Sequence, residues 1–300
     1  MCNRLCFVLF FCISLSLLSC VGQSAETDFP YDLERPATYQ KLPKVLEEIS
    51  GLAYAGKNRV YCVQDEKGMV FLYDLDKEKI IEEIPFGDPG DFEGIAKGED
   101  WIYVLRSDGK LYSFRLPKTG GKLGIINETY LNLGPQCNAE GLGYDARNLR
   151  LIIACKGLSK SKKAEKRFYE VAIRPDKMKA NLIFSLSAAA IQDPINWLDR
   201  EHYEQSVTNL KKVKTFNPSG IARHPITEDL YVLSSAGKLL AVLSENGKLK
   251  RIIPLNPDRF RQPEGIAFDR NGNLFISNEG RGGRAVIFLF TYTRIKRTKL

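Results

Sequence analysis

The chain has 300 residues, 44% of them hydrophobic and 27% charged, with a formal net charge of +8 at pH 7. This is the composition of a globular protein with a large apolar core. It excludes an intrinsically disordered chain, a collagen and a polytopic membrane protein. The excess of basic residues favours an anionic partner.

Residues 1–19 have the features of a lipoprotein signal peptide. Residues 5–18 form an apolar run after Arg4, and this run is shorter than the ~20 residues of a membrane-spanning helix. The letters LLSC at 17–20 resemble the bacterial lipoprotein box, so we predict lipidation at Cys20, with ordinary cleavage after Ser24 as the alternative. Residues 20–36 are then a tether, and the protein is exported, anchored to the inner or outer membrane and facing the periplasm.

Three cysteines remain beyond this leader. Cys62 and Cys155 lie in apolar runs and are predicted to be buried small hydrophobes, whereas Cys137 precedes a motif in a loop. A bridge between Cys137 and Cys155 is an alternative that the spacing does not favour.

A short motif sets the expected architecture. Ser or Glu, then Gly, then Leu or Ile recurs from residues 50, 93, 140, 219 and 264, at spacings of 43, 47, 79 and 45. β-Branched and aromatic runs with turn residues follow each copy, which indicates four short antiparallel strands per period. Periods of this length are typical of propeller blades, and the 79-residue interval approximates two periods, with a degenerate unit near 180.

We therefore predict an all-β protein, a six-bladed β-propeller of four-stranded antiparallel blades over residues 37–294, followed by a basic tail at 295–300. The run at 284–293 is expected to pair with the N-terminal segment and close the ring. Residues 188–214 have partial helical spacing and are predicted to be a partly helical decoration near blade 4.

Several motifs together carry a family resemblance. After EISGLAYA, the segments GDFEGIA, CNAEGLGYD, NPSGIARHPITEDLYVLSS and QPEGIAFDRNGNLFISNEG follow in order. Over roughly residues 42–290 the chain resembles the SdiA-regulated (YjiK-like) family. The resemblance implies an exported, often membrane-associated six-bladed propeller and no settled activity.

Antiparallel pairing predicts where polar side chains gather. The first residue of each inner strand lies beside the last residue of the next strand, so one channel mouth should collect the side chains that open the motif. The candidate ligand or metal residues are Glu93, Glu140, Glu264, Asp65, Asn278 and Glu279. Their expected neighbours at the mouth are Asp91, Arg106, Lys156, Arg259 and Arg261.

Two interpretations of this mouth remain open. The carboxylates form a structural salt network with the cations, or they converge and bind Ca²⁺ through their oxygens. No catalytic residue is predicted, because His202 and His224 are the two histidines and no G-x-S-x-G motif is present.

The favoured function is a membrane-anchored binding or interaction module that acts through its channel mouth. Its partners would be the membrane, and an envelope protein, polymer or small anionic ligand; nucleic acid is not expected, because the chain is predicted to be exported. The alternatives are a calcium-dependent hydrolase of an ester, lactone or phosphoester, and a purely structural scaffold.

Overall fold

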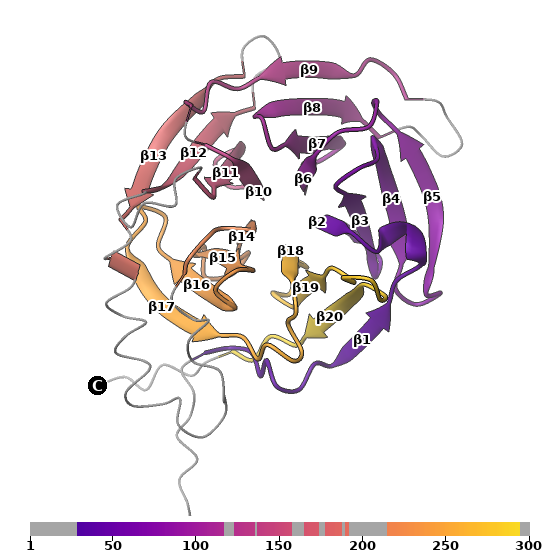
Figure 1. Ribbon diagram of the computed structural model, residues 1–300, viewed down its shortest axis with the longest axis vertical. Coiled ribbons are helices and arrows are strands. Elements are labelled where there is room, and N and C mark those ends of the chain that lie inside the picture. The colour runs from indigo at the N-terminus through magenta and orange to yellow at the C-terminus, as the bar shows by residue number, and fades with distance from the viewer. Residues whose placement is uncertain are drawn as a thin grey trace, which may run out of the picture.

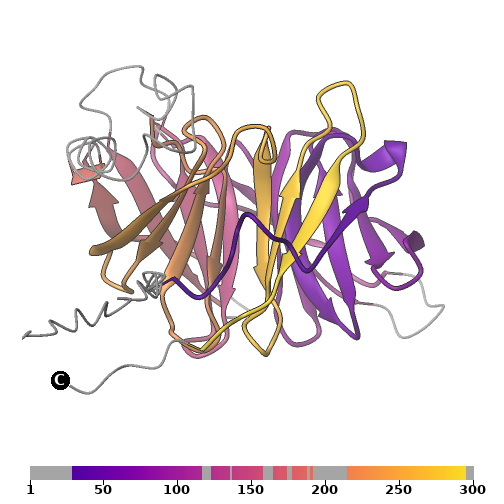
Figure 2. The same cartoon turned by 90° about the horizontal axis from the view of Figure 1, so that it is seen from below.

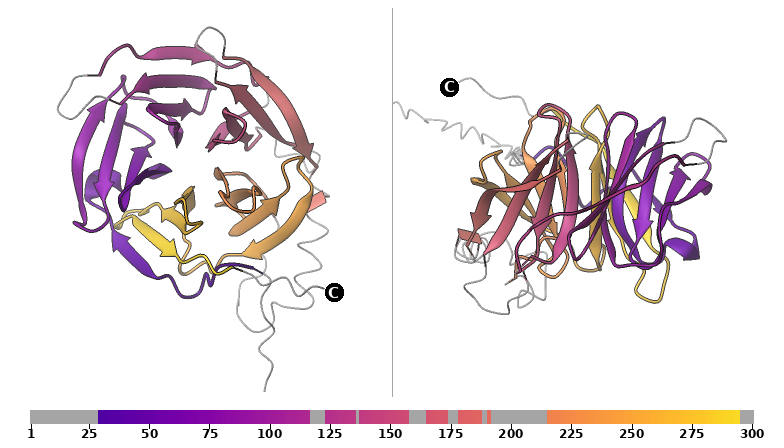
Figure 3. Two further views of the ribbon diagram at one scale, coloured as in Figure 1. Left: turned by 180° about the vertical axis from the view of Figure 1, so that it is seen from behind. Right: turned by 90° about the horizontal axis from the view of Figure 1, so that it is seen from above.

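The architecture is a ring of five four-stranded antiparallel sheets around one axis, seen in a computed structural model. The structure describes residues 29–116, 123–135, 137–157, 165–173, 178–187, 190–191 and 215–294. Figures 1 and 3 show the ring from its two sides, with β2, β6, β10, β14 and β18 innermost.

Each blade is a meander of consecutive strands from the axis outward, and the last blade is completed by the N-terminal strand. Blade 1 contains β2 (Ile49–Gly56), β3 (Arg59–Gln64), β4 (Met69–Asp74) and β5 (Lys79–Pro85). Blade 2 contains β6 (Phe92–Lys97), β7 (Trp101–Arg106), β8 (Lys110–Arg115) and β9 (Asn127–Tyr130). Blade 3 contains β10 (Ala139–Asp145), β11 (Arg150–Cys155), β12 (Lys166–Ala172) and β13 (Ala180–Leu186).

Blade 4 contains β14 (Gly220–Arg223), β15 (Leu230–Ser234), β16 (Leu239–Leu243) and β17 (Leu249–Pro254). Blade 5 contains β18 (Pro263–Phe268), β19 (Leu274–Asn278), β20 (Val286–Phe290) and β1 (Thr38–Lys41). β1 pairs antiparallel with β20, Thr38 opposite Leu289 and Lys41 opposite Val286, which confirms the predicted ring closure. A 3-10 helix, η1 (Lys44–Leu46), connects β1 to the first blade.

The prediction of an all-β propeller with four-stranded antiparallel blades is confirmed, but the predicted number of six blades is wrong. The runs assigned to a degenerate unit near 180 are β12 and β13, the outer strands of blade 3. The 79-residue interval is long because residues 156–165 lie between β11 and β12 and residues 187–219 lie between β13 and β14. The described residues contain no sixth sheet.

The hydrophobic core lies between the blades. Each of the five buried clusters combines side chains from two neighbouring blades, as where Val63 and Tyr61 of blade 1 pack with Ile95 and Phe114 of blade 2. A blade therefore buries its faces only against its neighbours, and the ring is stable as one unit.

The glycine of the repeated motif allows this close packing at the axis. A Cβ on Gly94 would lie 2.8 Å from the Cβ of Leu142 in the next blade, and a Cβ on Gly220 would overlap the carbonyl oxygen of Glu264. These positions require glycine because neighbouring backbone occupies the space of a side chain.

The ring has two faces, which we name by the inner strands. These strands begin at the mouth face, with residues such as Glu93 and Glu140, and end at the cavity face, with residues such as Lys97 and Arg223. Figure 2 shows the ring edge-on, with the described chain ends at its lower edge, the cavity face. There the Thr293 N–H donates to the Pro30 carbonyl oxygen at 2.9 Å.

The segment before β1 packs on the ring. Tyr31 and Leu33 are buried in the cluster between blades 4 and 5, and Phe29 packs against Tyr31 and Tyr231. This stretch is the end of the predicted tether, and the remainder of the tether lies outside the described residues.

Several predictions fall on residues that the structure does not describe: the signal peptide at 1–19, lipidation at Cys20, the tail at 295–300, and His202. Of the predicted decoration at 188–214, only Ala190 and Ile191 are described, and Ile191 is buried against blades 3 and 4. Among the described residues, no helix is long and apolar enough to cross a membrane.

Candidate functional site

Five polar side chains open the inner strands at the mouth face, as the motif predicted. Two are serines that tie neighbouring blades together: Ser50 Oγ donates to the Phe92 carbonyl oxygen at 2.5 Å, and Ser219 Oγ donates to that of Pro263 at 2.9 Å. The other three are glutamates, in blades 2, 3 and 5. The serines therefore stabilise the contacts between blades, and the glutamates are the ionisable residues of the motif at this end of the axis.

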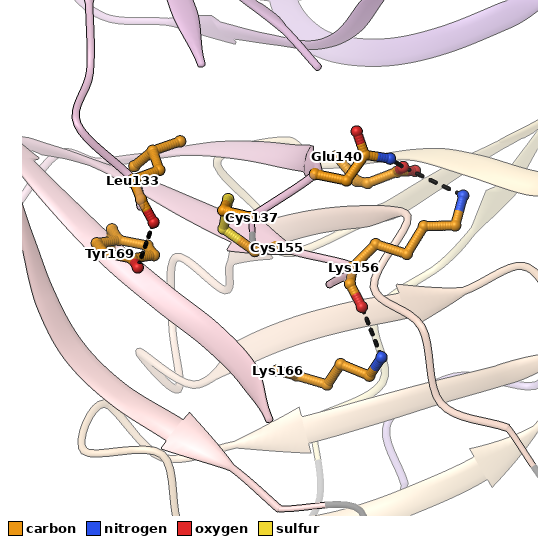
Figure 4. The surroundings of a disulfide bond; sticks show 8 residues. Leu133, Cys137, Glu140, Cys155, Lys156, Lys166 and Tyr169 are labelled. Atoms are coloured by element: carbon orange, nitrogen blue, oxygen red, sulfur yellow. Dashed lines mark hydrogen bonds and ion pairs between the residues drawn. A yellow bond between two sulfur atoms is a disulfide. The ribbon is translucent and has the colours of Figure 1, made fainter. Parts of the chain in front are cut away.

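Glu93, Glu140 and Glu264 share a single cation. Lys156 Nζ lies 3.1 Å from Glu140 Oε1, as Figure 4 shows. The Asn138 side-chain amide donates to the same oxygen. The Lys156 charge also acts on Glu93 and Glu264. We call Glu93, Glu140, Glu264 and Lys156 the carboxylate ring.

Burial and mutual repulsion disfavour ionisation in the carboxylate ring. Burial, together with the charges of Glu140, Asp91 and Glu264, raises the pKa of Glu93 to about 9. Burial and the Glu140 charge raise the pKa of Glu264 to about 8, although the Ser235 hydroxyl donates to it. Burial also raises the pKa of Glu140 despite Lys156. At neutral pH the carboxylate ring therefore retains protons on its glutamates.

Lys156 stays charged in this setting. Burial alone would lower its pKa, but the Glu140, Glu264 and Glu93 charges raise it above the ordinary value. The lysine thus compensates one carboxylate, and protons compensate the others.

The carboxylate ring does not have the arrangement expected of the predicted calcium site. Within the described part of the chain, no three acidic, histidine or cysteine side chains come together in an arrangement that could hold a metal ion. Lys156 bonds to Glu140, whose oxygens would have to face the ion.

The other predicted carboxylates adjoin the carboxylate ring, because the Glu279 charge acts on Glu264 and the Asp91 charge acts on Glu93 and Glu140. Burial raises the pKa of Asp65 to about 6, helped by Glu48, Glu66 and Asp91, and one of its side-chain oxygens has no partner. Burial and the Asp65 charge raise the pKa of Glu279. Asp65 and Glu279 therefore influence each other beside blade 1.

Asn278, at the end of β19, is 2% exposed, and neither polar atom of its side-chain amide has a hydrogen-bond partner. Asp91 accepts a hydrogen bond from the Ser107 hydroxyl.

The predicted arginine partners are engaged elsewhere or exposed. Arg106 pairs with Asp108, two residues away. Arg259 lies 3.9 Å from Glu34 and over the ring of Phe288, and Arg261 is exposed. Lys156 is the one predicted cation that the described structure places among the glutamates.

A disulfide positions the Glu140–Lys156 pair. Cys137 and Cys155 are bonded, with their Cα atoms 5.1 Å apart, so the prediction of Cys155 as an unpaired hydrophobe is wrong. The bond joins the residue before Asn138 to the residue before Lys156 (Figure 4). Cys62 is free and buried, as predicted. The spacing could not reveal this pairing, because strand register brings the two cysteines together.

Sequence reasoning missed a large hollow at the opposite end of the axis. A cavity of about 1050 Å³ opens at the cavity face, lined by the ends of the inner strands and the hairpins after them. None of the carboxylate-ring residues lines it. Its apolar floor consists of Leu52, Ile95, Leu142, Ile221 and Ile266. These are the aliphatic residues of the repeated motif, so the signal was present in the sequence.

The rim of this cavity is charged and contains more cations than anions. Its basic residues are Lys57, Arg59, Lys97, Arg223 and Arg270, and its acidic residues are Glu99, Asp100 and Asp269. Arg59 and Arg223 are paired with Asp74 and Asp145, respectively.

Lys97 and Arg270 are the rim cations that interact with each other. Burial lowers the pKa of Lys97, and the nearby Arg270 charge lowers it further, against the opposing effect of Asp100. Lys97 Nζ donates to the Gly98 and Glu99 carbonyl oxygens at 3.1 and 2.9 Å. Two like charges from blades 2 and 5 thus face a common opening, an arrangement that an anion would stabilise.

Comparison with known proteins identifies the family. The model of the SdiA-regulated family matches residues 27–281. The chain belongs to the SdiA-regulated family. None of the curated proteins searched matches this member of the family.

Solved structures share the fold. Glutaminyl cyclase from Myxococcus xanthus is 12% identical, with a TM-score of 0.51 over 87% of this chain and 97% of that one. PQQ-bound aldose sugar dehydrogenase from Streptomyces coelicolor is 13% identical, with a TM-score of 0.50 over 85% and 99%. A Bacteroides thetaiotaomicron protein of unknown function is 16% identical, with a TM-score of 0.49; the match covers 77% of this chain and 52% of that one, so the SdiA-regulated chain spans about half its length. At these identities the likeness concerns the fold alone.

Proposed function

We propose that this propeller is a ligand-binding module whose axial cavity receives an amphipathic organic anion. The observation that carries the proposal is the cavity of about 1050 Å³, with an apolar floor at one end and the cation pair Lys97 and Arg270 at its rim. A cavity that combines apolar surface with a few placed polar groups is a common form of small-molecule site.

The floor and the rim would recognise different parts of the ligand. The aliphatic side chains that line the floor would contact a hydrocarbon or aromatic group of the ligand. Lys97 and Arg270 would face a carboxylate, sulfonate or phosphate group. The carboxylate ring would then be structural, closing the mouth face and fastening Glu140 to Lys156.

We propose further that the protein is exported and held at a membrane through Cys20. The lipoprotein box and the apolar run support this placement. The Cys137–Cys155 bond adds independent support, because structural disulfides persist in oxidising compartments outside the cytosol.

The binding proposal can be tested with two fluorescent probes of similar shape. 1-Anilinonaphthalene-8-sulfonate carries an anionic group, and N-phenyl-1-naphthylamine lacks it. Lys97→Met and Arg270→Met should each weaken binding of the sulfonate by about five- to tenfold, as the loss of one charged contact, and leave the neutral probe unchanged.

Lys67→Met is the matched control, because Lys67 is exposed on the mouth face. Equal effects of all three substitutions on the sulfonate, or equal losses for both probes, would contradict the proposed site. Near-ultraviolet circular dichroism of each variant establishes that the probes report on a folded protein.

A further inference from the structure

Both described chain ends lie on the cavity face. Phe29 packs 5.4 Å from the ring of Tyr31 and 6.3 Å from that of Tyr231, and Thr293 bonds to Pro30 beside it. Eight residues separate Cys20 from Phe29. Fully extended, such a stretch reaches about 30 Å, so a lipid on Cys20 holds this face near the bilayer.

A buried hydrogen-bond chain fixes the N-terminal segment in this position. The Tyr31 hydroxyl donates to the Gly272 carbonyl oxygen at 2.6 Å and lies 2.7 Å from His224 Nε2. His224 Nδ1 accepts from the backbone N–H groups of Ile226 and Thr227, so the proton lies on Nε2, which donates to Tyr31. The segment therefore cannot swing to the other face without breaking this chain.

Two large apolar side chains project from neighbouring hairpins on the same face. Leu149, between β10 and β11, is 56% exposed, and Ile226, between β14 and β15, is 49% exposed. An ion pair between Arg147 and Glu228 joins the two hairpins. Leu149 has a φ of 48°, a left-handed conformation that is unfavourable for a leucine.

Ile125 is 81% exposed just before β9, at the cavity end of blade 2, and other strongly exposed apolar side chains lie at the circumference. Tyr130 and Leu182, for example, are on the outermost strands β9 and β13. Leu149 and Ile226 differ from these residues because they lie on hairpins that follow inner strands.

A basic segment of the sequence begins at the same face. Residues 294–300 contain four Lys or Arg and no acidic residue, and Arg294 is exposed beside the N-terminal segment. An anionic leaflet attracts basic residues that lie close to its surface. A lipid anchor and a basic cluster are the two signals that together give stable membrane attachment.

We infer that the cavity face docks on the anionic membrane surface that carries the anchor, with Leu149 and Ile226 entering the headgroup region. The axial cavity then opens toward the bilayer, and the carboxylate ring faces away from it. This inference rests on the proposed lipid anchor at Cys20 and not on the chemistry of the ligand.

The test uses the full chain, reconstituted in vesicles of phosphatidylethanolamine and phosphatidylglycerol. Single reactive cysteines are introduced on the cavity face by Leu149→Cys or Ile226→Cys, and on the mouth face by Lys67→Cys or Asp88→Cys, and labelled with a nitrobenzoxadiazole dye. In the lipidated chain Cys2, Cys6 and Cys12 are removed with the predicted signal peptide and the Cys20 thiol carries the lipid. Cys62 is buried, and Cys137 and Cys155 are bonded, so these three stay unlabelled.

The cavity-face labels should be quenched by nitroxide lipids and shielded from aqueous iodide, and the mouth-face labels should show the reverse. Equal iodide access on both faces, or lipid quenching confined to the mouth face, would overturn the inference. A chain that does not stay with the vesicles would also overturn it, whereas probe binding in the cavity would be unaffected.

A second measurement isolates the contribution of the hairpins. In the Cys20→Ser chain, flotation with the same vesicles should fall about tenfold when Leu149→Ser and Ile226→Ser are combined, because two partly inserted apolar side chains are lost. Leu182→Ser is the matched control, since Leu182 is 55% exposed at the circumference. An equal effect of the control would contradict docking through these hairpins.

Discussion

Replacing Glu93 by glutamine should stabilise the protein and flatten its response to alkaline pH. Burial and the neighbouring carboxylates raise the pKa of Glu93 from 4.5 to about 9. An acid with a raised folded-state pKa gives stability that is complete below the unfolded value and is lost as pH rises toward the folded value. The relevant window is therefore pH 4.5 to about 9.

The size of the effect follows from the same shift. Each pH unit in this window costs about 1.4 kcal/mol for one retained proton, so at pH 7 wild type loses at most about 3 kcal/mol at this position. Glu140 and Glu264 share the repulsion, so the expected gain for Glu93→Gln at pH 7 is about 1–3 kcal/mol. Glutamine keeps the shape of the side chain and removes the charge.

Urea unfolding at pH 6.5, 7.5 and 8.5 measures this directly. The difference in unfolding free energy between Glu93→Gln and wild type should widen as pH rises. Glu83→Gln is the control, because Glu83 is exposed on β5 and should behave as wild type. Parallel pH dependence for wild type and Glu93→Gln would refute the description of a crowded, proton-holding ring.

Three further perturbations test other parts of the structure. Gly220→Ala should lower the unfolding free energy of the propeller in urea by about 1–3 kcal/mol, because the new Cβ would overlap the Glu264 carbonyl oxygen. Gly124→Ala is the control, since Gly124 has open space around it, and equal effects of the two substitutions would argue against axial crowding. Cys137→Ser with Cys155→Ser should lower the unfolding free energy by about 3 kcal/mol for the loop that the disulfide closes, and unchanged unfolding would contradict a structural role. Calcium added after chelator treatment should leave the melting temperature unchanged, since Lys156 compensates Glu140, and stoichiometric binding by calorimetry would contradict that assignment.

Much of the fold could be predicted from the sequence, because motif and register act locally. Ser50 and Glu93 open inner strands as expected, since a glycine followed by an aliphatic residue marks each axial strand. The blade count failed because the length of an interval does not distinguish a degenerate blade from long connections. β12 and β13 continue the hydrogen-bonded ladder of β11, and only pairing shows this.

The candidate site was predicted less completely. Strand register correctly predicted that Glu140 lies near Lys156. Arg106 instead pairs with Asp108 in its own turn, and the spacing of residues in the sequence does not show which of two possible ion pairs forms. The axial cavity escaped prediction because its floor is built from single aliphatic residues that are far apart in the chain. Such residues indicate a core unless the space they surround is known.

The most direct test of the central claim is a crystal structure of the mature domain with bound 1-anilinonaphthalene-8-sulfonate. The naphthalene ring should lie on the floor formed by the five motif aliphatics, with the sulfonate facing Lys97 and Arg270. A probe bound at the mouth face or on an outer strand, with the cavity left empty, would contradict the proposed binding site.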